Sequence, residues 1–178
     1  MEGDEIKFVF NKYNKKFKEL YKREKRKLKK ILPGTAKTEH IGSSSVDGLS
    51  GKGIIDIIVS VPKKEFVKTR KNLEKNGWWF RPKAKPQRDR RFLEKRYKYR
   101  KLIRIVHLHL TYHNSFVWKR FISLRDYLKK NKAACKEYEK VKKRAVAYAK
   151  GEGKDYRAYK NKFMKKIEKE ALKEFNKK

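Results

Sequence analysis

The first residues able to do chemistry lie in a turn between two predicted strands. Gly42 and Ser43 open a run of small residues that also contains Ser44 and ends near Lys52. A glycine–serine turn exposes backbone N–H groups, and a serine hydroxyl can join them, which gives the donor set that binds a phosphate tail. Lys52 adds a positive charge. The turn is therefore a candidate phosphate-binding site.

Asp56 is a carboxylate in the middle of an apolar run. Two isoleucines precede it and two follow it, within a segment over 54–61 that is predicted to be a central strand. An ionised carboxylate in such surroundings is costly unless it is paired or bound to a metal. Perturbed carboxylates concentrate at functional sites, so Asp56 is a candidate. The alternative is a hydrogen bond to a neighbouring loop and no further role.

Two histidines form a second candidate group. His107 and His109 are two residues apart in a predicted strand over 103–111, so both side chains point to the same face. This geometry suits two metal ligands, or one ligand and one acid or base. A structural role is the alternative for each. His40, just before Gly42, is a third candidate.

Basic side chains dominate the composition and supply further candidates. Arg90, Arg91, Arg125 and Lys160 are able to meet phosphate oxygens, although a solvated surface role is the alternative for each arginine. The chain has 54 Lys and Arg against 20 Asp and Glu, a net charge of +34. Such a surface attracts nucleic acid, nucleotides and anionic lipid. A lysine-rich host proteome would give the same composition.

The elements that must position these residues are predicted from periodicity and from β-branched runs. In chain order they are a helix over 14–31, strands over 38–41 and 54–61, a helix over 63–76, strands from Trp78, near 91–95 and over 103–111, and three helices in a tail over about 115–178. This order is typical of an α/β (α+β) protein with a mixed sheet flanked by helices.

Several inward positions follow from the helical spacing. In the helix over 63–76, Phe66, Val67 and Leu73 are expected to face the core. The two tryptophans that follow are expected to be core residues. The first of the three tail helices is expected to begin at a Ser115 cap. In the second, the side that carries Tyr138 and Tyr148 is expected to face inward.

Length and cysteine content set the broad class. The chain fits a single domain over 1–178 with no linker. Cys135 is the only cysteine, so neither a disulfide framework nor a cysteine zinc site forms within one chain. The residues at 1–4 start acidic, without an apolar signal core, and no apolar run is long enough to cross a bilayer. A cytoplasmic protein without a membrane partner is expected.

The combination of these segments resembles the GrpB family. The matching residues are Glu39-His40-Ile41-Gly42-Ser43-Ser44-Ser45-Val46, Gly48-Leu49, Lys52, Ile54-Ile55-Asp56-Ile57, Arg90-Arg91-Phe92, His107-Leu108-His109, Trp118, Leu124-Arg125-Asp126-Tyr127-Leu128, Tyr138, Val141-Lys142, Tyr156, Lys160 and Phe163. The likeness covers almost the whole chain in the right order. It implies a nucleotidyltransferase-type fold, related to DNA polymerase β.

In that wider superfamily, a Gly-Ser turn holds a nucleoside triphosphate, and an Asp-x-Asp pair with a third carboxylate holds two magnesium ions. Gly42, Ser43 and Asp56 match this pattern, whereas the second acid position is Ile58. The resemblance places His109 where a third acid is expected. Asp56 and His109 are thus the predicted ligands of Mg²⁺ or another divalent cation.

The chain departs from the GrpB pattern beside the turn. Asp47 replaces one usual proline, and Gly51-Lys52-Gly53 lacks another. Loss of both prolines is expected to loosen the turn. Asp47 is either an extra ligand or a turn-stabilising residue.

Three functions remain open at this point. The first is nucleotidyl transfer from a nucleoside triphosphate to an unknown acceptor, with Asp56, His107 and His109 as catalytic residues. Its phosphate-binding residues are Gly42, Ser43, Ser44, Lys52, Arg91, Arg125 and Lys160. The second is an inactive scaffold that binds nucleotide, RNA or DNA through its basic surface. The third is a metal-dependent hydrolase. The first needs the turn, Asp56 and the two histidines to converge, and the third needs Asp56 and the two histidines. The second depends on the positive field of the surface and is expected to be indifferent to the loss of Asp56.

Overall fold

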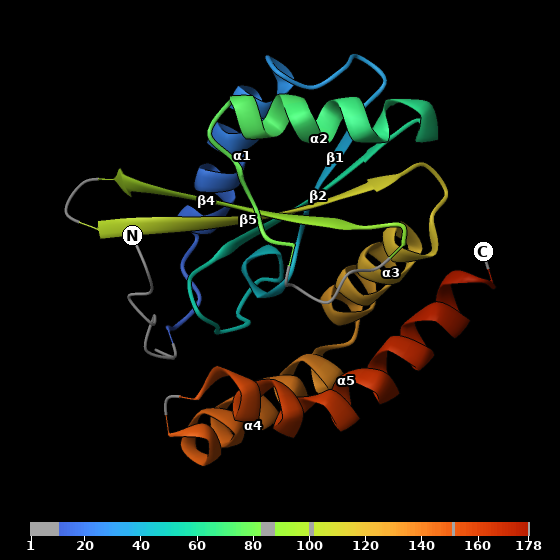
Figure 1. Cartoon of the computed structure of the whole chain (residues 1–178). Helices are drawn as coiled ribbons and strands as arrows, with labels where there is room; N and C mark the ends of the chain where they lie inside the picture. Colours follow the sequence, from blue (N-terminus) through green and yellow to red (C-terminus); the bar gives the residue numbers. More distant parts are fainter. Residues whose placement is uncertain (1–10, 83–87, 100–101, 151, 178) are drawn as a thin grey trace.

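The computed structural model describes residues 11–82, 88–99, 102–150 and 152–177, which form a five-stranded sheet with helices on both faces (Figure 1). The strands are β1 (Lys37–Ile41), β2 (Ile55–Val61), β3 (Trp79–Phe80), β4 (Arg91–Tyr99) and β5 (Leu102–Tyr112). The helices are α1 (Lys16–Lys29), α2 (Phe66–Lys75), α3 (Phe116–Lys130), α4 (Lys132–Ala149) and α5 (Gly153–Phe175). The predicted α/β (α+β) class, with a mixed sheet and a helical tail, is confirmed.

The sheet has the strand order β1-β2-β5-β4-β3, in which β2 and β5 are parallel and the other pairs are antiparallel. The second strand, β2, lies between two neighbours and is covered on both faces, which is why it is apolar almost throughout. The pairing register places Asp56 beside His107, and His107 beside Glu94. Three ionisable side chains from three adjacent strands therefore form one row.

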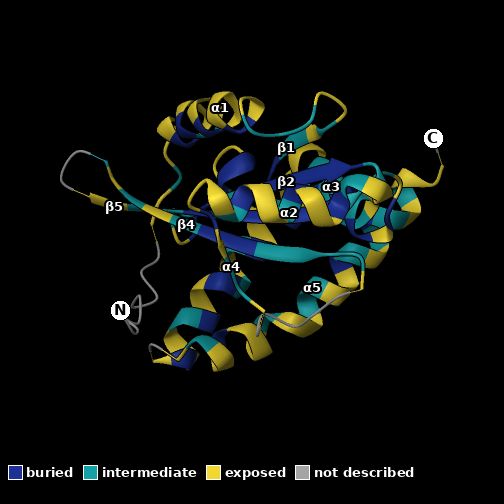
Figure 2. Ribbon diagram, turned by 45° about the horizontal axis from the view of Figure 1, so that its top comes forward, coloured by how far each residue is buried: buried dark blue, intermediate teal, exposed yellow. Residues whose placement is uncertain are grey.

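Helices cover the two faces of the sheet differently. On one face, α1 and α2 pack against Ile55, Ile57, Val59 and Leu108 in the largest apolar cluster. The other face is covered by α3, with α4 and α5 beyond it (Figure 1). Figure 2 shows the buried colour along β2 and exposed residues on the outer sides of the helices. Asp56 and both candidate histidines belong to the face that α3 covers.

Several inward positions were predicted wrongly. Val67 and Trp79 are 57% and 59% exposed. The segment over 63–76 begins with a 3₁₀ turn at Lys63–Glu65, and Phe66, Thr69 and Leu73 form the buried side of the α-helix that follows. Val67 lies six residues before Leu73, which at ~3.6 residues per turn places it about a third of a turn away from that side. Trp78 is buried but the next residue in an extended strand points outward.

The prediction that Tyr148, near the end of α4, faces inward was also wrong. Tyr148 is exposed, and its ring contacts that of Tyr159. The buried side of α4 consists of Ala134, Tyr138, Lys142, Ala145 and Ala149. Tyr138 and Ala145 were expected inward, whereas the lysine between them was not.

Other boundaries shift by small amounts. The strand expected near 91–95 extends to Tyr99 because it pairs with the full length of β5. Ser115 caps α3 as predicted, and its hydroxyl accepts a hydrogen bond from Trp118 N at 3.1 Å. The acidic start at residues 1–4 lies outside the described residues. Among the described residues, no helix has the length and apolar character needed to cross a membrane.

Substitutions of Ile58 test how tightly α3 packs on its face of the sheet. It is fully buried with Ile41 and Val117. We expect Ile58→Asp to lower the free energy of unfolding at pH 7 by about 4 kcal/mol, because placing a carboxyl group in this apolar interior at pH 7 costs free energy of that order. Ile58→Val, which keeps the apolar character, should cost about 1 kcal/mol. Urea unfolding of both variants gives the comparison, and a similar small loss for both would contradict the sealed packing.

Candidate functional site

The turn after β1 is pressed against the carboxylate of Asp56. Gly42 has φ 69°, a conformation that side chains disfavour, and it leads into the 3₁₀ turn Ser43–Ser45. A Cβ atom on Gly42 would overlap Asp56 Oδ2 and would lie 3.0 Å from Asp56 Cγ. The Asp56 side chain is 26% exposed, so apolar packing does not enclose it. The carboxylate therefore points toward the turn and remains accessible.

A histidine holds Asp56 from the neighbouring strand. His107 Nδ1 donates to Asp56 Oδ1 at 3.2 Å, and His107 Nε2 lies 3.4 Å from Glu94 Oε2. Burial alone lowers the pKa of His107, but its hydrogen bonds and charge interactions with both carboxylates raise it to about 9. The hydrogen bond from His107 in turn lowers the pKa of Glu94 to about 2. Burial raises the pKa of Asp56, yet the hydrogen bond from His107 and the nearby histidine charges hold it below its usual value.

The second histidine has a different environment. His109 is buried between the rings of Phe92 and Phe121, and its Nδ1 lies 3.2 Å from Arg90 Nη1. Burial lowers its pKa to about 3, with the Arg90 charge in the same direction. His109 is therefore a neutral side chain at pH 7, whereas His107 is protonated.

Two adjoining cavities lie on either side of Asp56. One, of about 190 Å³, is lined by His107, and the other, of about 210 Å³, is lined by His109. Ser43, Asp56 and Lys160 line both cavities. The predicted convergence thus occurs around Asp56, although the two histidines open on different spaces.

Lysines surround the turn on the His107 side. The buried Lys142 Nζ donates to Ser43 Oγ at 2.7 Å and also to the carbonyl of Ser50. Gly51 leaves room for this amine, since a Cβ there would lie 3.2 Å from Lys142 Nζ. Burial, and then the charge of Lys160, lower the pKa of Lys142 to about 7.

Two more lysines face the same cavity. Lys52 and Lys160 lie over the ring of Tyr156, at 4.9 and 5.0 Å from its centroid. Burial lowers the pKa of Lys52 to about 7, with the charges of Lys160 and Arg157 as further causes. The cavity of about 190 Å³ therefore gathers amines, a hydroxyl and one paired carboxylate, a set that suits an anion with several oxygens.

The remaining predicted residues have mostly structural contacts. Arg125 lines the second cavity and donates to Glu39 Oε2 at 2.6 Å and to the carbonyl of His40 at 3.1 Å. Ser44 lies 3.0 Å from His40 Nε2. Arg91 is not part of the group, because it pairs with Leu110 on the opposite face of the sheet.

His40 and Asp47 also have structural partners. His40 stacks on Tyr21 with ring centroids 4.5 Å apart, and burial lowers its pKa to about 4. Asp47 accepts hydrogen bonds from Tyr13 and Lys18, both at 2.7 Å. These contacts favour the turn-stabilising interpretation of Asp47. The segment without prolines is tied down as well, since Asn11 and Gly51 exchange backbone hydrogen bonds of 2.7 and 2.9 Å.

Two site residues were missed by the sequence reasoning. Glu94 is recognised as part of the site only from the strand register, which places it opposite His107. Lys142 had a usable signal, because it lies four residues after Tyr138 and three before Ala145 on the buried side of α4. A lysine at an inward helical position needs a partner, and Ser43 is that partner.

The donor set does not fit a site for two magnesium ions. Among the described residues, no group of three His, Cys, Asp or Glu side chains is arranged to hold a metal ion. Asp56 is already paired with the protonated His107, and Ile58 fills the place of the second acid. The Nδ1 atom of His109 faces the Arg90 guanidinium. This arrangement equally leaves the metal-dependent hydrolase without a ligand set.

This chain is similar to known proteins in both sequence and structure. The family model described as GrpB protein matches residues 7–170. A crystal structure of conserved protein GrpB from Enterococcus faecalis superimposes with a TM-score of 0.79 and 32% identity, and covers 94% of this chain and 99% of that one. The Cid1 poly(U) polymerase gives a TM-score of 0.43 at 15% identity, over 75% of this chain and 45% of that chain.

Two relatives show the extent of the sequence similarity. UPF0157 protein YqkA of Bacillus subtilis is 30% identical over 76% of this chain, but the match spans only 38% of that protein. Glutamate-rich protein GrpB of Alkalihalophilus pseudofirmus is 29% identical over 74% of this chain and 76% of its own length.

Gly42 and Gly48 provide a matched pair of substitutions. Both have positive φ, but no atom lies within 4 Å of a Cβ placed on Gly48. Gly48→Ala should therefore cost about 1 kcal/mol of unfolding free energy, from backbone strain alone. Gly42→Ala adds the overlap with Asp56 and should cost about 3 kcal/mol. Equal losses in denaturant unfolding would show that the close approach to Asp56 does not constrain the turn.

His107 gives the stability a pH dependence of definite sign. Its pKa is raised from 6.5 to about 9 in the folded protein, so its contribution is complete below pH 6.5 and is lost as the pH rises through 9. The contribution of His107 should fall by about 3 kcal/mol over that window. Lys52 and Lys142, with lowered pKa values, contribute in the opposite direction.

The comparison with His107→Gln isolates this dependence, because both lysines are present in both proteins. The difference in unfolding free energy between wild type and variant should shrink from pH 6.5 to pH 9. A difference that stays constant across the window would show that His107 is not protonated between the two carboxylates.

Proposed function

Because this chain belongs to the GrpB family, we propose that it binds the phosphate groups of a nucleotide beside the Gly42–Ser43 turn. The observation that carries this proposal is the buried Lys142 ammonium on Ser43 Oγ. Family membership supports the assignment of the turn, since the matched residues 7–170 include it.

A bound phosphate would relieve the electrostatic cost of the site. Burial and the charge of Lys160 lower the pKa of Lys142 to about 7. Lys52 is exposed at the surface, and desolvation together with the charges of Lys160 and Arg157 lowers its pKa to about 7 as well. Each is therefore only partly protonated at neutral pH, and an anion placed between them favours the charged form. Binding would take up protons and would be strongest below pH 7.

The size of the site suits a phosphate tail with part of a nucleotide. The cavities of about 190 and 210 Å³ share Ser43, Asp56 and Lys160. Their combined volume falls in the lower part of the usual range of ligand pockets, roughly 300–1,000 Å³. The phosphates would lie on the lysine side, which leaves the His109 side for the remainder of the molecule.

Lys142→Met tests the proposal, because it keeps the length of the side chain and removes the charge. We expect at least tenfold weaker binding of ATP without metal, since a hydrogen bond to a charged group contributes roughly 1.5–3 kcal/mol. Lys140→Met is the control, as Lys140 is exposed on the same helix. Calorimetric titration at pH 6.5 measures both. Equal ATP affinity in the two variants, or no ATP binding by the wild type, would refute the proposal.

Nucleotidyl transfer is a second candidate function. It is favoured by one observation, the contact of the accessible Asp56 carboxylate with the turn. In this case the substrate would be the magnesium complex of a nucleoside triphosphate, which brings its own phosphate ligands, with Asp56 as the one carboxylate beside the turn that would hold the metal and an acceptor hydroxyl as the second substrate.

Asp56→Asn distinguishes transfer from binding alone. If the protein only binds phosphate, removal of a negative charge leaves ATP affinity unchanged or higher, with or without magnesium. If transfer occurs, the variant loses the part of the affinity that depends on magnesium and forms no labelled product from labelled ATP. The first result excludes a catalytic role for Asp56.

A further inference from the structure

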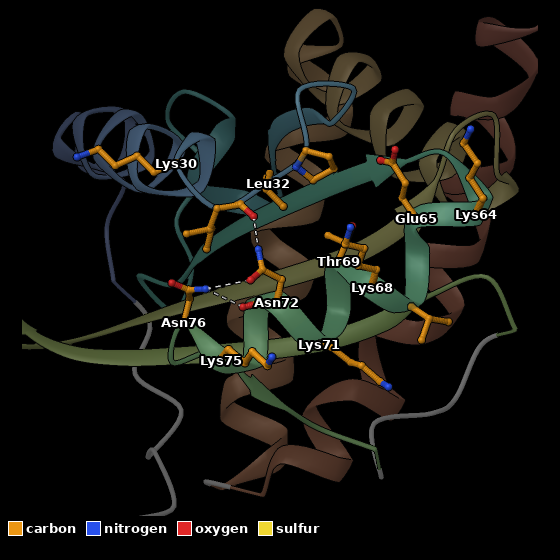
Figure 3. Close-up of a pocket in the computed structure, with 13 residues that line it drawn as sticks. Lys30, Leu32, Lys64, Glu65, Lys68, Thr69, Lys71, Asn72, Lys75 and Asn76 are labelled. Atoms are coloured by element: carbon orange, nitrogen blue, oxygen red, sulfur yellow. Dashed lines mark hydrogen bonds between the residues drawn. The ribbon is translucent and has the colours of Figure 1, made fainter.

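A second cationic feature lies on the opposite face of the sheet from the turn. It is a groove of about 1,050 Å³ between α2 and the loop that follows α1 (Figure 3). Its lining residues are Lys30, Ile31, Leu32, Pro33, Lys64, Glu65, Val67, Lys68, Thr69, Lys71, Asn72, Lys75 and Asn76. Five lysines and one acid line this groove, a net charge of +4 for its lining.

The lysines of the groove form a regular row. Lys64, Lys68, Lys71 and Lys75 follow one another at spacings of four, three and four residues, which places them on one side of η2 (Lys63–Glu65) and α2. All four are exposed. At a helical rise of ~1.5 Å per residue, the row is about 16 Å long. In the described part of the chain, none of the four lies within ion-pair distance of an acid.

The walls of the groove are joined by side-chain hydrogen bonds. Asn72 Nδ2 donates to the carbonyl of Ile31 at 2.6 Å, and the Asn76 side chain donates back to the Asn72 carbonyl at 2.8 Å (Figure 3). Near the other end, Thr35 Oγ1 donates to Glu65 Oε2 at 2.9 Å. These bonds fix the two walls of the groove relative to each other, and its one acid already has a partner.

Arginines and aromatic rings lie next to the groove. An adjoining cavity of about 590 Å³ shares Val67 with it and is lined by Phe66, Phe80, Phe92, Arg70, Arg81, Arg88, Arg90 and Arg91. Within this cavity, the half-buried ring of Phe80 lies under the Arg70 guanidinium, which is 5.1 Å from the ring centroid. A partly exposed ring beside a row of cations is an element with which proteins bind single strands.

We infer that this groove binds the sugar–phosphate backbone of single-stranded nucleic acid, with a base directed toward the Phe80 ring of the adjoining cavity. The row of lysines would contact successive phosphates, and the apolar wall at Leu32 and Val67 would contact sugars. This site is separate from the nucleotide site at the turn, and the sheet lies between them.

The test must separate a local site from the general charge of the chain. The groove variant is Lys64→Gln/Lys68→Gln/Lys71→Gln/Lys75→Gln. The control is Lys162→Gln/Lys166→Gln/Lys169→Gln/Lys173→Gln on α5, where all four lysines are exposed at the same spacings of four, three and four. Both variants remove four charges from exposed positions, and thermal unfolding of each confirms that the fold is retained.

Fluorescence anisotropy with labelled 20-mers of uridine and thymidine measures the affinity at several salt concentrations. The groove variant should bind at least tenfold more weakly, and its salt slope should fall by about 3, since each lost phosphate contact changes the slope by about 0.7. The α5 variant should lose much less. The difference between the uridine and thymidine strands identifies the preferred sugar.

Equal losses in the two variants would overturn the inference, because they would mean that only the overall charge matters. Duplex binding that is as tight, and as sensitive to the groove variant, would overturn the assignment to single strands. The variants Lys142→Met and Asp56→Asn should leave oligonucleotide affinity unchanged, so failure of the nucleotide site and failure of the groove are separate results.

Discussion

A protonated imidazole between two carboxylates is the interaction on which this structure depends. The central strand β2 is otherwise apolar, and it tolerates Asp56 because His107 lies opposite on β5, with Glu94 beyond it on β4. The charges alternate across three strands, so each has an opposite neighbour. Once Asp56 is fixed, the turn must approach it closely, and only a glycine at position 42 leaves enough room.

The two faces of the sheet place lysine in different environments. Beside the turn, Lys142 is withdrawn from water, and its pKa falls to about 7. Along α2, the lysines of the groove are exposed to solvent, which suits a long flexible polyanion more than a small buried one. The high positive charge of this chain is therefore not uniform in its physical effect, even though lysines occur in nearly every segment.

Residues whose role depends on local sequence were predictable, and residues whose role depends on packing were not. Gly42, Ser43 and Asp56 stand out because a small-residue turn and an apolar strand are visible within twenty residues. Glu94 has no such signal, because its importance comes from the alignment of three strands. Lys142 lies in a helix that contains several other lysines, and only its inward position distinguishes it from them. Val67 was misplaced because it directly follows the buried Phe66 and so lies ~100° around the helix from it.

The hydrogen bond from Lys142 to Ser43 joins residues 99 positions apart in the chain, and that from Ser50 to Glu139 joins residues 89 apart. Contacts between residues so far apart in the sequence form slowly, since a long loop must close before they contribute to stability. The residues of the turn are neighbours in the sequence, whereas the helix that furnishes the amine comes from the distant end of the chain. The turn acquires its ammonium only in the complete tertiary structure, where Val46 and Leu49 also pack against Tyr138 of α4.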